Sequence, residues 1–116
     1  MDNRRILIVE DDVLIGMMLV DMFDALDLPE PAQATTNEEA LAIIAGESVA
    51  GALVDINLGD EKGWPVADAL AAKDIPFAFT SGGGDVIPPA HAHRKLVTKP
   101  FRISDIEATL DQFFAK

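Results

Sequence analysis

The sequence contains no cysteine, so it can form neither disulfide bonds nor thiolate metal sites. It also lacks any apolar run of the roughly 20 residues that a transmembrane helix needs. The short apolar run that ends before Glu10 is not followed by the cleavage site of a signal peptide. We therefore expect a cytoplasmic protein without a membrane segment and without a redox role.

Basic residues are scarce as well. The 9 Lys and Arg residues stand against 20 Asp and Glu, which gives a formal net charge of -11. Such a surface repels phosphate backbones and anionic lipids, so nucleic acid is not an expected partner. The length of 116 residues and the 49% hydrophobic content predict one folded domain over residues 1–116, with no separate output domain.

Short aliphatic runs that stop at polar residues alternate with longer segments in which apolar residues recur at helical spacing. Thr36 and Ser104 each precede a Glu by three residues, which predicts two capping boxes, and Asp12 is interpreted as a helix-start residue. The expected strands cover 6–9, 32–35, 51–55, 76–80 and 95–98, and the expected helices cover 13–26, 36–46, 65–73 and 104–114.

This alternation predicts an α/β fold: a doubly wound, five-stranded parallel sheet with helices on both faces. Pro88 and Pro89 interrupt residues 85–94, so the fourth helix of such a fold is expected to be short, irregular or disordered. His91 and His93 in this stretch are interpreted as exposed loop residues rather than metal ligands.

Ligands of such sheets bind beyond the carboxyl ends of the strands. The side chains expected there are those of Glu10, Asp11, Asp55, Ser81 and Lys99. Neighbouring carboxylates repel one another and oxygen ligands suit Mg²⁺, so the acids predict a Mg²⁺ site. With charge neutralised by Lys99 and the metal, the Asp55 carboxylate can attack phosphorus, and the Ser81 hydroxyl can bind the transferred phosphoryl group.

Taken in order, these motifs resemble the CheY-like receiver domains of response regulators over essentially the whole chain. The resemblance rests on residues 6–12 (ILIVEDD), 54–58 (VDINL) and 99–101 (KPF). It implies a flavodoxin-like strand order 2-1-3-4-5 and phosphorylation of Asp55 by the phosphohistidine of a histidine kinase. It also implies Mg²⁺ ligation by Asp11, Asp55 and the main-chain carbonyl of Asn57, with Glu10 acting through water.

The same resemblance implies a two-component phosphorylation switch rather than a turnover enzyme. Such a switch signals by protein-protein interaction or acts as a phosphate sink, as a monomer or weak dimer. Residues 76–82 (PFAFTSG) further resemble the marker of the "FAT GUY" receivers of alphaproteobacteria, which are paired with HWE or HisKA_2 histidine kinases.

Two departures from the receiver pattern affect the expected mechanism. Thr80-Ser81-Gly82-Gly83 replaces the usual Ala-Thr-Gly-Tyr, so the switch hydroxyl is either Ser81 or Thr80, and counting from Pro76 favours Ser81. Leu96 stands where most receivers have an aromatic residue. We therefore expect phosphorylation to order residues 85–94 instead of turning an aromatic side chain inward.

Two other functions fit parts of the pattern. A small aspartyl-phosphate phosphohydrolase also uses an Asp after a strand, with Mg²⁺ and Lys, but it needs a second acid where Asn57 stands. A receiver-like interaction domain that takes no phosphate would have no reason to keep clustered acids together with Lys99.

Overall fold

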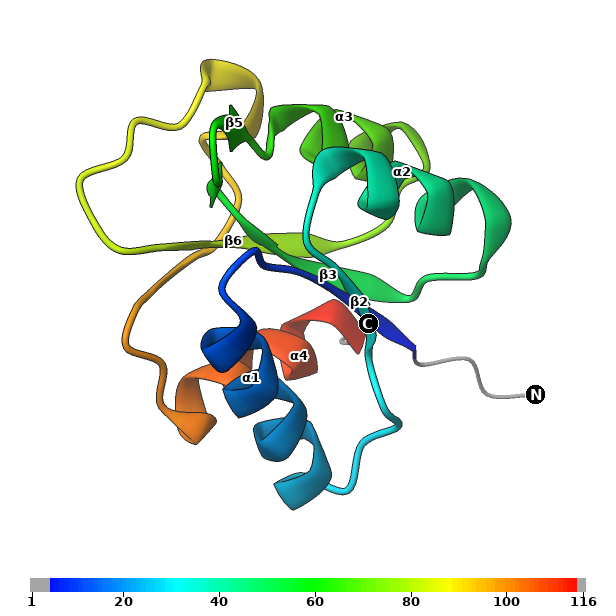
Figure 1. Cartoon of the computed structure of the whole chain (residues 1–116), viewed down its shortest axis with the longest axis vertical. Helices are drawn as coiled ribbons and strands as arrows, with labels where there is room; N and C mark the ends of the chain where they lie inside the picture. The colour runs from blue at the N-terminus through cyan, green and yellow to red at the C-terminus, as the bar shows by residue number, and fades with distance from the viewer. Residues whose placement is uncertain (1–4, 115–116) are drawn as a thin grey trace.

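A parallel sheet forms the centre of the protein, as shown by a computed structural model that describes residues 5–114 (Figure 1). Along the chain, the elements are β1 (Ile6–Val9), α1 (Val13–Ala25), β2 (Ala32–Ala34), α2 (Asn37–Gly46), β3 (Gly51–Asp55), β4 (Asn57–Leu58), β5 (Glu61–Lys62), α3 (Trp64–Ala72), β6 (Phe77–Ser81), the 3-10 helix η1 (Pro89–His91), β7 (Leu96–Thr98) and α4 (Ile103–Phe114). The five-stranded sheet has the order β2-β1-β3-β6-β7. When only its own strands are counted, this order is 2-1-3-4-5, which confirms the predicted fold.

Helices cover both faces of the sheet, with α2 and α3 on one face and α1 and α4 on the other (Figure 1). Strand side chains alternate between two apolar clusters. Leu7 and Val9 of β1 pack with residues of α2 and α3, whereas Ile6 and Ile8 pack with residues of α1 and α4. Burial on both faces explains why the strands are continuous apolar runs. Within residues 5–114 no helix is long and apolar enough to cross a membrane.

Side chains that follow the strands cap the first two helices. The Asp12 carboxylate accepts from the N–H groups of Leu14 and Ile15 at 2.9 and 3.3 Å, so it caps α1 as expected. Thr36 caps α2 in the predicted way. The predicted cap at Ser104 is wrong, because α4 already begins at Ile103. The Asp105 carboxylate instead accepts from the backbone N–H of Arg102 at 3.2 Å.

The chain after β3 forms a feature that the sequence did not predict. Asn57 pairs with Lys62, and Leu58 with Glu61, in a two-stranded antiparallel hairpin of β4 and β5. Gly63 follows it, where a Cβ atom would lie only 2.7 Å from the Asp55 carbonyl oxygen. The close approach of Gly63 brings the hairpin and the start of α3 against the end of β3.

Residues 82–95, here called the β6–β7 segment, contain no α-helix, and η1 is their only regular element. This agrees with the expected short or irregular fourth helix. His93 is exposed, as predicted, but the prediction for His91 is wrong because its side chain is buried. Its Nε2 lies 2.7 Å from Oδ1 of Asp68 on α3, and its ring packs edge-on against Phe77 and Phe79. These contacts attach the later part of the segment to the fold.

Candidate functional site

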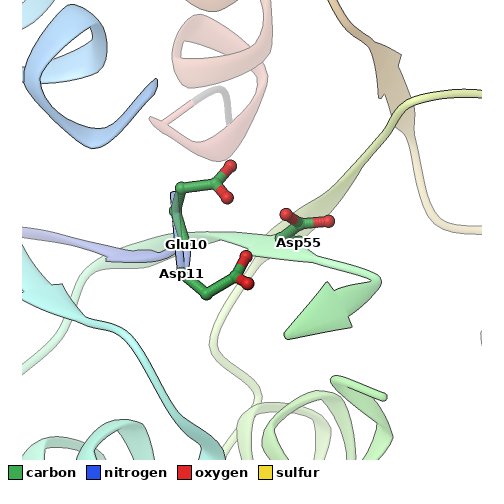
Figure 2. A group of neighbouring side chains, drawn as sticks. All are labelled: Glu10, Asp11 and Asp55. Carbon is green, nitrogen blue, oxygen red and sulfur yellow. The ribbon is translucent and has the colours of Figure 1, made fainter. Parts of the chain in front are cut away.

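Acidic side chains meet at the carboxyl edge of the sheet, where β1 and β3 are neighbours. Parallel pairing aligns Val9 with Val54, so Glu10 and Asp55 emerge next to each other one residue later. Figure 2 shows Glu10 and Asp11 leaving the end of β1 close to Asp55. Carboxylate oxygens from these three residues lie within 4.8 Å of one another. The register of the sheet therefore produces the acidic cluster.

The cluster lines an open depression of about 310 Å³. Around its rim lie the amino end of α1, the β4–β5 hairpin, the first residue after β6 and the residue after β7. The lining residues are Glu10, Asp11, Asp12, Ile15, Asp55, Asn57, Gly59, Gly82 and Lys99. Five of the positions predicted for the site, Glu10, Asp11, Asp55, Asn57 and Lys99, thus line one solvent-accessible hollow, whereas Ser81 and Thr80 are not among its lining residues.

Burial makes the negative charges of the cluster costly. Glu10 and Asp55 are 5% and 3% exposed, whereas Asp11 is exposed. Burial and a hydrogen bond with Asp55 raise the pKa of Glu10 from 4.5 to about 7, against the opposing effects of the Asp12 N–H and Lys99. Glu10 is therefore close to its titration point near neutral pH.

Lys99 supplies the positive charge in the cluster. Its Nζ donates a hydrogen bond to Oδ2 of Asp55 at 2.8 Å and lies 3.0 Å from Oε1 of Glu10. Burial lowers the pKa of Lys99, but the hydrogen bond to Asp55 and the attraction of the Asp55 and Glu10 carboxylates outweigh this effect, so the net direction is upward. The ammonium group is therefore charged. The backbone N–H of Lys99 donates to the Ser81 carbonyl at 2.7 Å, which fixes its position beside β6.

The donor set fits a hard divalent cation. Oε1 of Glu10 is buried and has no hydrogen bond among the described residues; its contact with the Lys99 ammonium is an ion pair. Oδ1 of Asp55 accepts one bond, from the Asn57 N–H at 3.1 Å. Carboxylate oxygens that retain free lone pairs beside a solvent-accessible depression suit Mg²⁺, which keeps several of its waters.

Ser81 lies at the end of β6 and is fully buried. Its hydroxyl donates to Oδ2 of Asp85 and accepts from the N–H of Gly83 at 2.9 Å. Thr80, the alternative switch residue, is aligned with Asp55 in the sheet. Because strand side chains alternate, Thr80 and Ser81 point to opposite faces. The carboxylate that accepts from the Ser81 hydroxyl belongs to Asp85, a residue that the sequence did not indicate.

Asp85 connects Ser81 to the β4–β5 hairpin. Its Oδ1 accepts from Nδ2 of Asn57 at 3.0 Å and lies 3.8 Å from Nζ of Lys62, which itself donates to Oδ1 of Asn57. The hydrogen bonds from Ser81 and then Asn57 hold the pKa of Asp85 below its usual value. No sequence pattern pointed to Asp85 or Lys62, since their link to the site exists only through the folded loop.

Comparison with known proteins gave no matching family model. The chain is similar to SdrG from Sphingomonas melonis Fr1, with 39% identity and a TM-score of 0.84 over 97% of both chains. A structure of the BeF3-activated conformation of SdrG gives 41% identity and a TM-score of 0.78 over 91% of this chain and 94% of the other.

A curated relative, the regulatory protein VirG of Rhizobium rhizogenes, is 30% identical over 80 residues, or 68% of this chain. The chain spans only about a third (33%) of the length of VirG. The response-regulator receiver domain of Erythrobacter litoralis PhyR is 33% identical, with a TM-score of 0.76 over 96% of this chain and 89% of that domain. This coverage, together with the shared fold, shows that the chain belongs to the receiver domains of response regulators.

Proposed function

We propose that residues 1–116 act as one receiver unit in which Asp55 accepts a phosphoryl group from the phosphohistidine of a histidine kinase. The observation that carries this proposal is the setting of the Asp55 carboxylate. One oxygen is hydrogen-bonded to the Lys99 ammonium, and the other is held by the Asn57 N–H at the edge of an open acidic depression. An aligned, partly neutralised carboxylate is what phosphoryl transfer requires of its acceptor.

In the proposed reaction, an Asp55 carboxylate oxygen forms a bond to phosphorus while the bond from phosphorus to the kinase imidazole breaks. Lys99 stabilises the negative phosphoryl oxygens, and the Ser81 hydroxyl binds one of them after transfer. Mg²⁺, when bound, supplies further positive charge to the same oxygens. Its proposed ligands are Asp11, Asp55 and the main-chain carbonyl of Asn57, with Glu10 acting through water.

The kinase is proposed to dock on α1. Four of the large apolar side chains exposed in the described part of the chain are on this helix, and they follow directly after the acidic cluster: Val13 (69%), Leu14 (73%), Met17 (58%) and Met18 (41%). An exposed apolar surface beside a reactive group is a typical protein-binding surface. A protein phosphodonor must also contact a surface that adjoins Asp55.

The kinase class and output are proposed from the resemblance at residues 76–82. Membership of the "FAT GUY" receivers would pair this chain with an HWE or HisKA_2 kinase. The output would be protein-protein interaction or a phosphate-sink role, as a monomer or weak dimer. Leu96 is 39% exposed and provides no ring to follow the switch hydroxyl. A conformational change in the β6–β7 segment is therefore the proposed route of the signal.

Phosphorylation of Asp55 can be tested with acetyl phosphate and Mg²⁺, followed by intact-protein mass spectrometry under mild conditions. We expect a phosphoryl adduct that requires Mg²⁺ and disappears in Asp55→Asn, which keeps the shape of the side chain but removes the nucleophile. Fluoroberyllate, which mimics a phosphoryl group without transfer, serves as a second probe in case the adduct is short-lived. Failure of both probes with the wild-type protein, or an equal adduct in Asp55→Asn, would refute the proposal.

A further inference from the structure

We propose that Asp85 is a latch: it holds the Ser81 hydroxyl and the Asn57 amide in the unphosphorylated protein and is displaced when a phosphoryl group forms on Asp55. This inference rests on the proposed function. Displacement of Asp85 would release the first part of the β6–β7 segment, at residues 82–86. This replaces the ordering of residues 85–94 expected from the sequence, because η1 and the buried His91 already hold the later part of the segment in place. The latch thereby converts phosphorylation into a movement of that loop.

Competition for one proton is the first step of the argument. The Ser81 hydroxyl has a single hydrogen, which it donates to Oδ2 of Asp85, while its oxygen accepts from the N–H of Gly83. Donation to a phosphoryl oxygen requires that same hydrogen. The bond from Ser81 to Asp85 and a bond from Ser81 to a phosphoryl group on Asp55 are therefore mutually exclusive.

Charge acts in the same direction. A phosphoryl group brings about -1.5 to -2 charges at neutral pH, and it would form in the depression lined by Asn57, whose side chain donates to the Asp85 carboxylate. The phosphoryl group and the Asp85 carboxylate carry like charges and therefore repel each other. The Lys62 side chain, which is 53% exposed, contacts both Asn57 and the Asp85 carboxylate. It can therefore stay near Asn57 when Asp85 moves away.

The loop after Ser81 is built so that one end can move while the other stays attached. Gly82, Gly83 and Gly84 have open space around them, and Gly83 and Gly84 adopt positive φ values of 111° and 78°. Val86 beyond them is 87% exposed. Within the described chain, the hydrogen bonds and ion pairs that join residues 82–87 to other residues are those of Asp85 and Gly83.

The later part of the segment is held firmly. His91 is buried and bonds to Asp68 at 2.7 Å, and the Arg94 guanidinium lies 4.2 Å from the centroid of the Phe77 ring. Ile87, which packs against the apolar cluster on the α2 and α3 side of the sheet, marks the start of this anchor. Loss of the Asp85 contacts would therefore free residues 82–86 between a glycine-rich hinge and the anchor. Val86 is the large apolar side chain that would move with them.

The latch can be tested by measuring the affinity for fluoroberyllate in the presence of Mg²⁺, with the fluorescence of the single tryptophan as readout. Trp64 reports on this region because it follows Gly63, which packs against the Asp55 carbonyl. A hydrogen bond to a carboxylate of this kind opposes a competing ligand by about 10-fold. We expect Asp85→Ala to bind fluoroberyllate about 10-fold more tightly than wild type, and Asp85→Asn, which retains one acceptor oxygen, to fall between them.

A double-mutant cycle separates the latch from a general charge effect. If Asp85 acts by holding the Ser81 hydroxyl, Asp85→Ala should gain affinity in the wild-type background and gain little in a Ser81→Ala background. Asp60→Ala, which removes an exposed acid from the hairpin turn, is the matched charge control and should change the affinity little.

The outcomes distinguish the latch from the proposed function. Wild-type binding together with equal or weaker binding by Asp85→Ala would overturn the latch and leave Asp55 as phosphoacceptor. The same gain in the Ser81→Ala background would also overturn it. No binding by wild type and by Asp85→Ala, with both folded by circular dichroism, would overturn the proposed function itself.

Discussion

Glu10→Gln should stabilise the metal-free protein at pH 8. The Glu10 side chain is 5% exposed and lies next to Asp55, so its ionised form is disfavoured in the folded state. Gln has nearly the same shape and carries no charge. In the unfolded chain Glu10 ionises without this penalty, which means that the cost of the charge falls on the folded state alone.

The magnitude follows from the pKa. A rise from 4.5 to about 7 corresponds to at most about 3.5 kcal/mol, at about 1.4 kcal/mol per pH unit. Solvent in the adjoining depression screens part of this, so we expect about 1–2 kcal/mol. A raised pKa favours folding below pH 4.5, and this contribution is lost as the pH rises through about 7. The advantage of Glu10→Gln should therefore grow from pH 5.5 to pH 8.

Thermal and urea unfolding in EDTA would measure this difference, with an expected rise in Tm at pH 8 of roughly 4–8 °C. Glu107→Gln, on the exposed side of α4, controls for the loss of one negative charge from a chain of net charge -11. Saturating Mg²⁺ should reduce the gap or reverse it, because the cation stabilises the wild-type carboxylate. A gap that is the same at pH 5.5 and pH 8 in EDTA would refute the reasoning.

Two further predictions concern packing and docking. Gly63→Ala places a Cβ 2.7 Å from the Asp55 carbonyl oxygen, so it should lower the free energy of unfolding in urea by about 1–3 kcal/mol. Gly46→Ala is the control and should not destabilise the protein, because nothing lies within 4 Å of the added Cβ. Equal stability of the two variants would contradict the close contact at Gly63. Leu14→Glu should slow transfer from a phosphohistidine protein by about 10-fold or more and leave labelling by acetyl phosphate unchanged. Leu96→Glu, on β7, is its surface control, and equal slowing of both donors by Leu14→Glu would count against docking on α1.

The fold could be predicted because each strand is a short apolar run and because apolar residues recur at helical spacing in each helix. Ile6–Val9 and Gly51–Asp55 are apolar almost throughout, which is possible only for strands covered on both faces. Their parallel alignment then fixes the positions of Glu10 and Asp55 without any further information. Helix starts were less certain because more than one polar residue can bond to the backbone of the first turn, and at α4 the Asp105 carboxylate accepts from the N–H of Arg102 while Ser104 lies within the helix.

The contacts around the site could not be predicted to the same extent, because they join loops that lack a periodic pattern. The β4 and β5 strands are two residues each, which is too short for an alternating pattern to be recognised. His91 is flanked by prolines and polar residues, yet the fold places it over the Phe77 and Phe79 rings. Asp85 is one acid among the 20 acidic residues of the chain until the loop turns back toward Ser81.

The charges at the site link the metal, the phosphoryl group and the latch. When all are ionised, the three carboxylates of the cluster exceed the single Lys99 ammonium by two negative charges. A divalent cation balances this excess. Phosphorylation then replaces the single charge of Asp55 with about -1.5 to -2, so the net charge of the cluster, its metal and Lys99 becomes negative again. The Asp85 carboxylate is the nearby anion held by hydrogen bonds to Ser81 and Asn57 rather than by a metal, and it can leave without breaking the sheet. Its departure removes one negative charge from the surroundings of the phosphoryl group, which is why we expect the signal to pass through Asp85 rather than through Leu96.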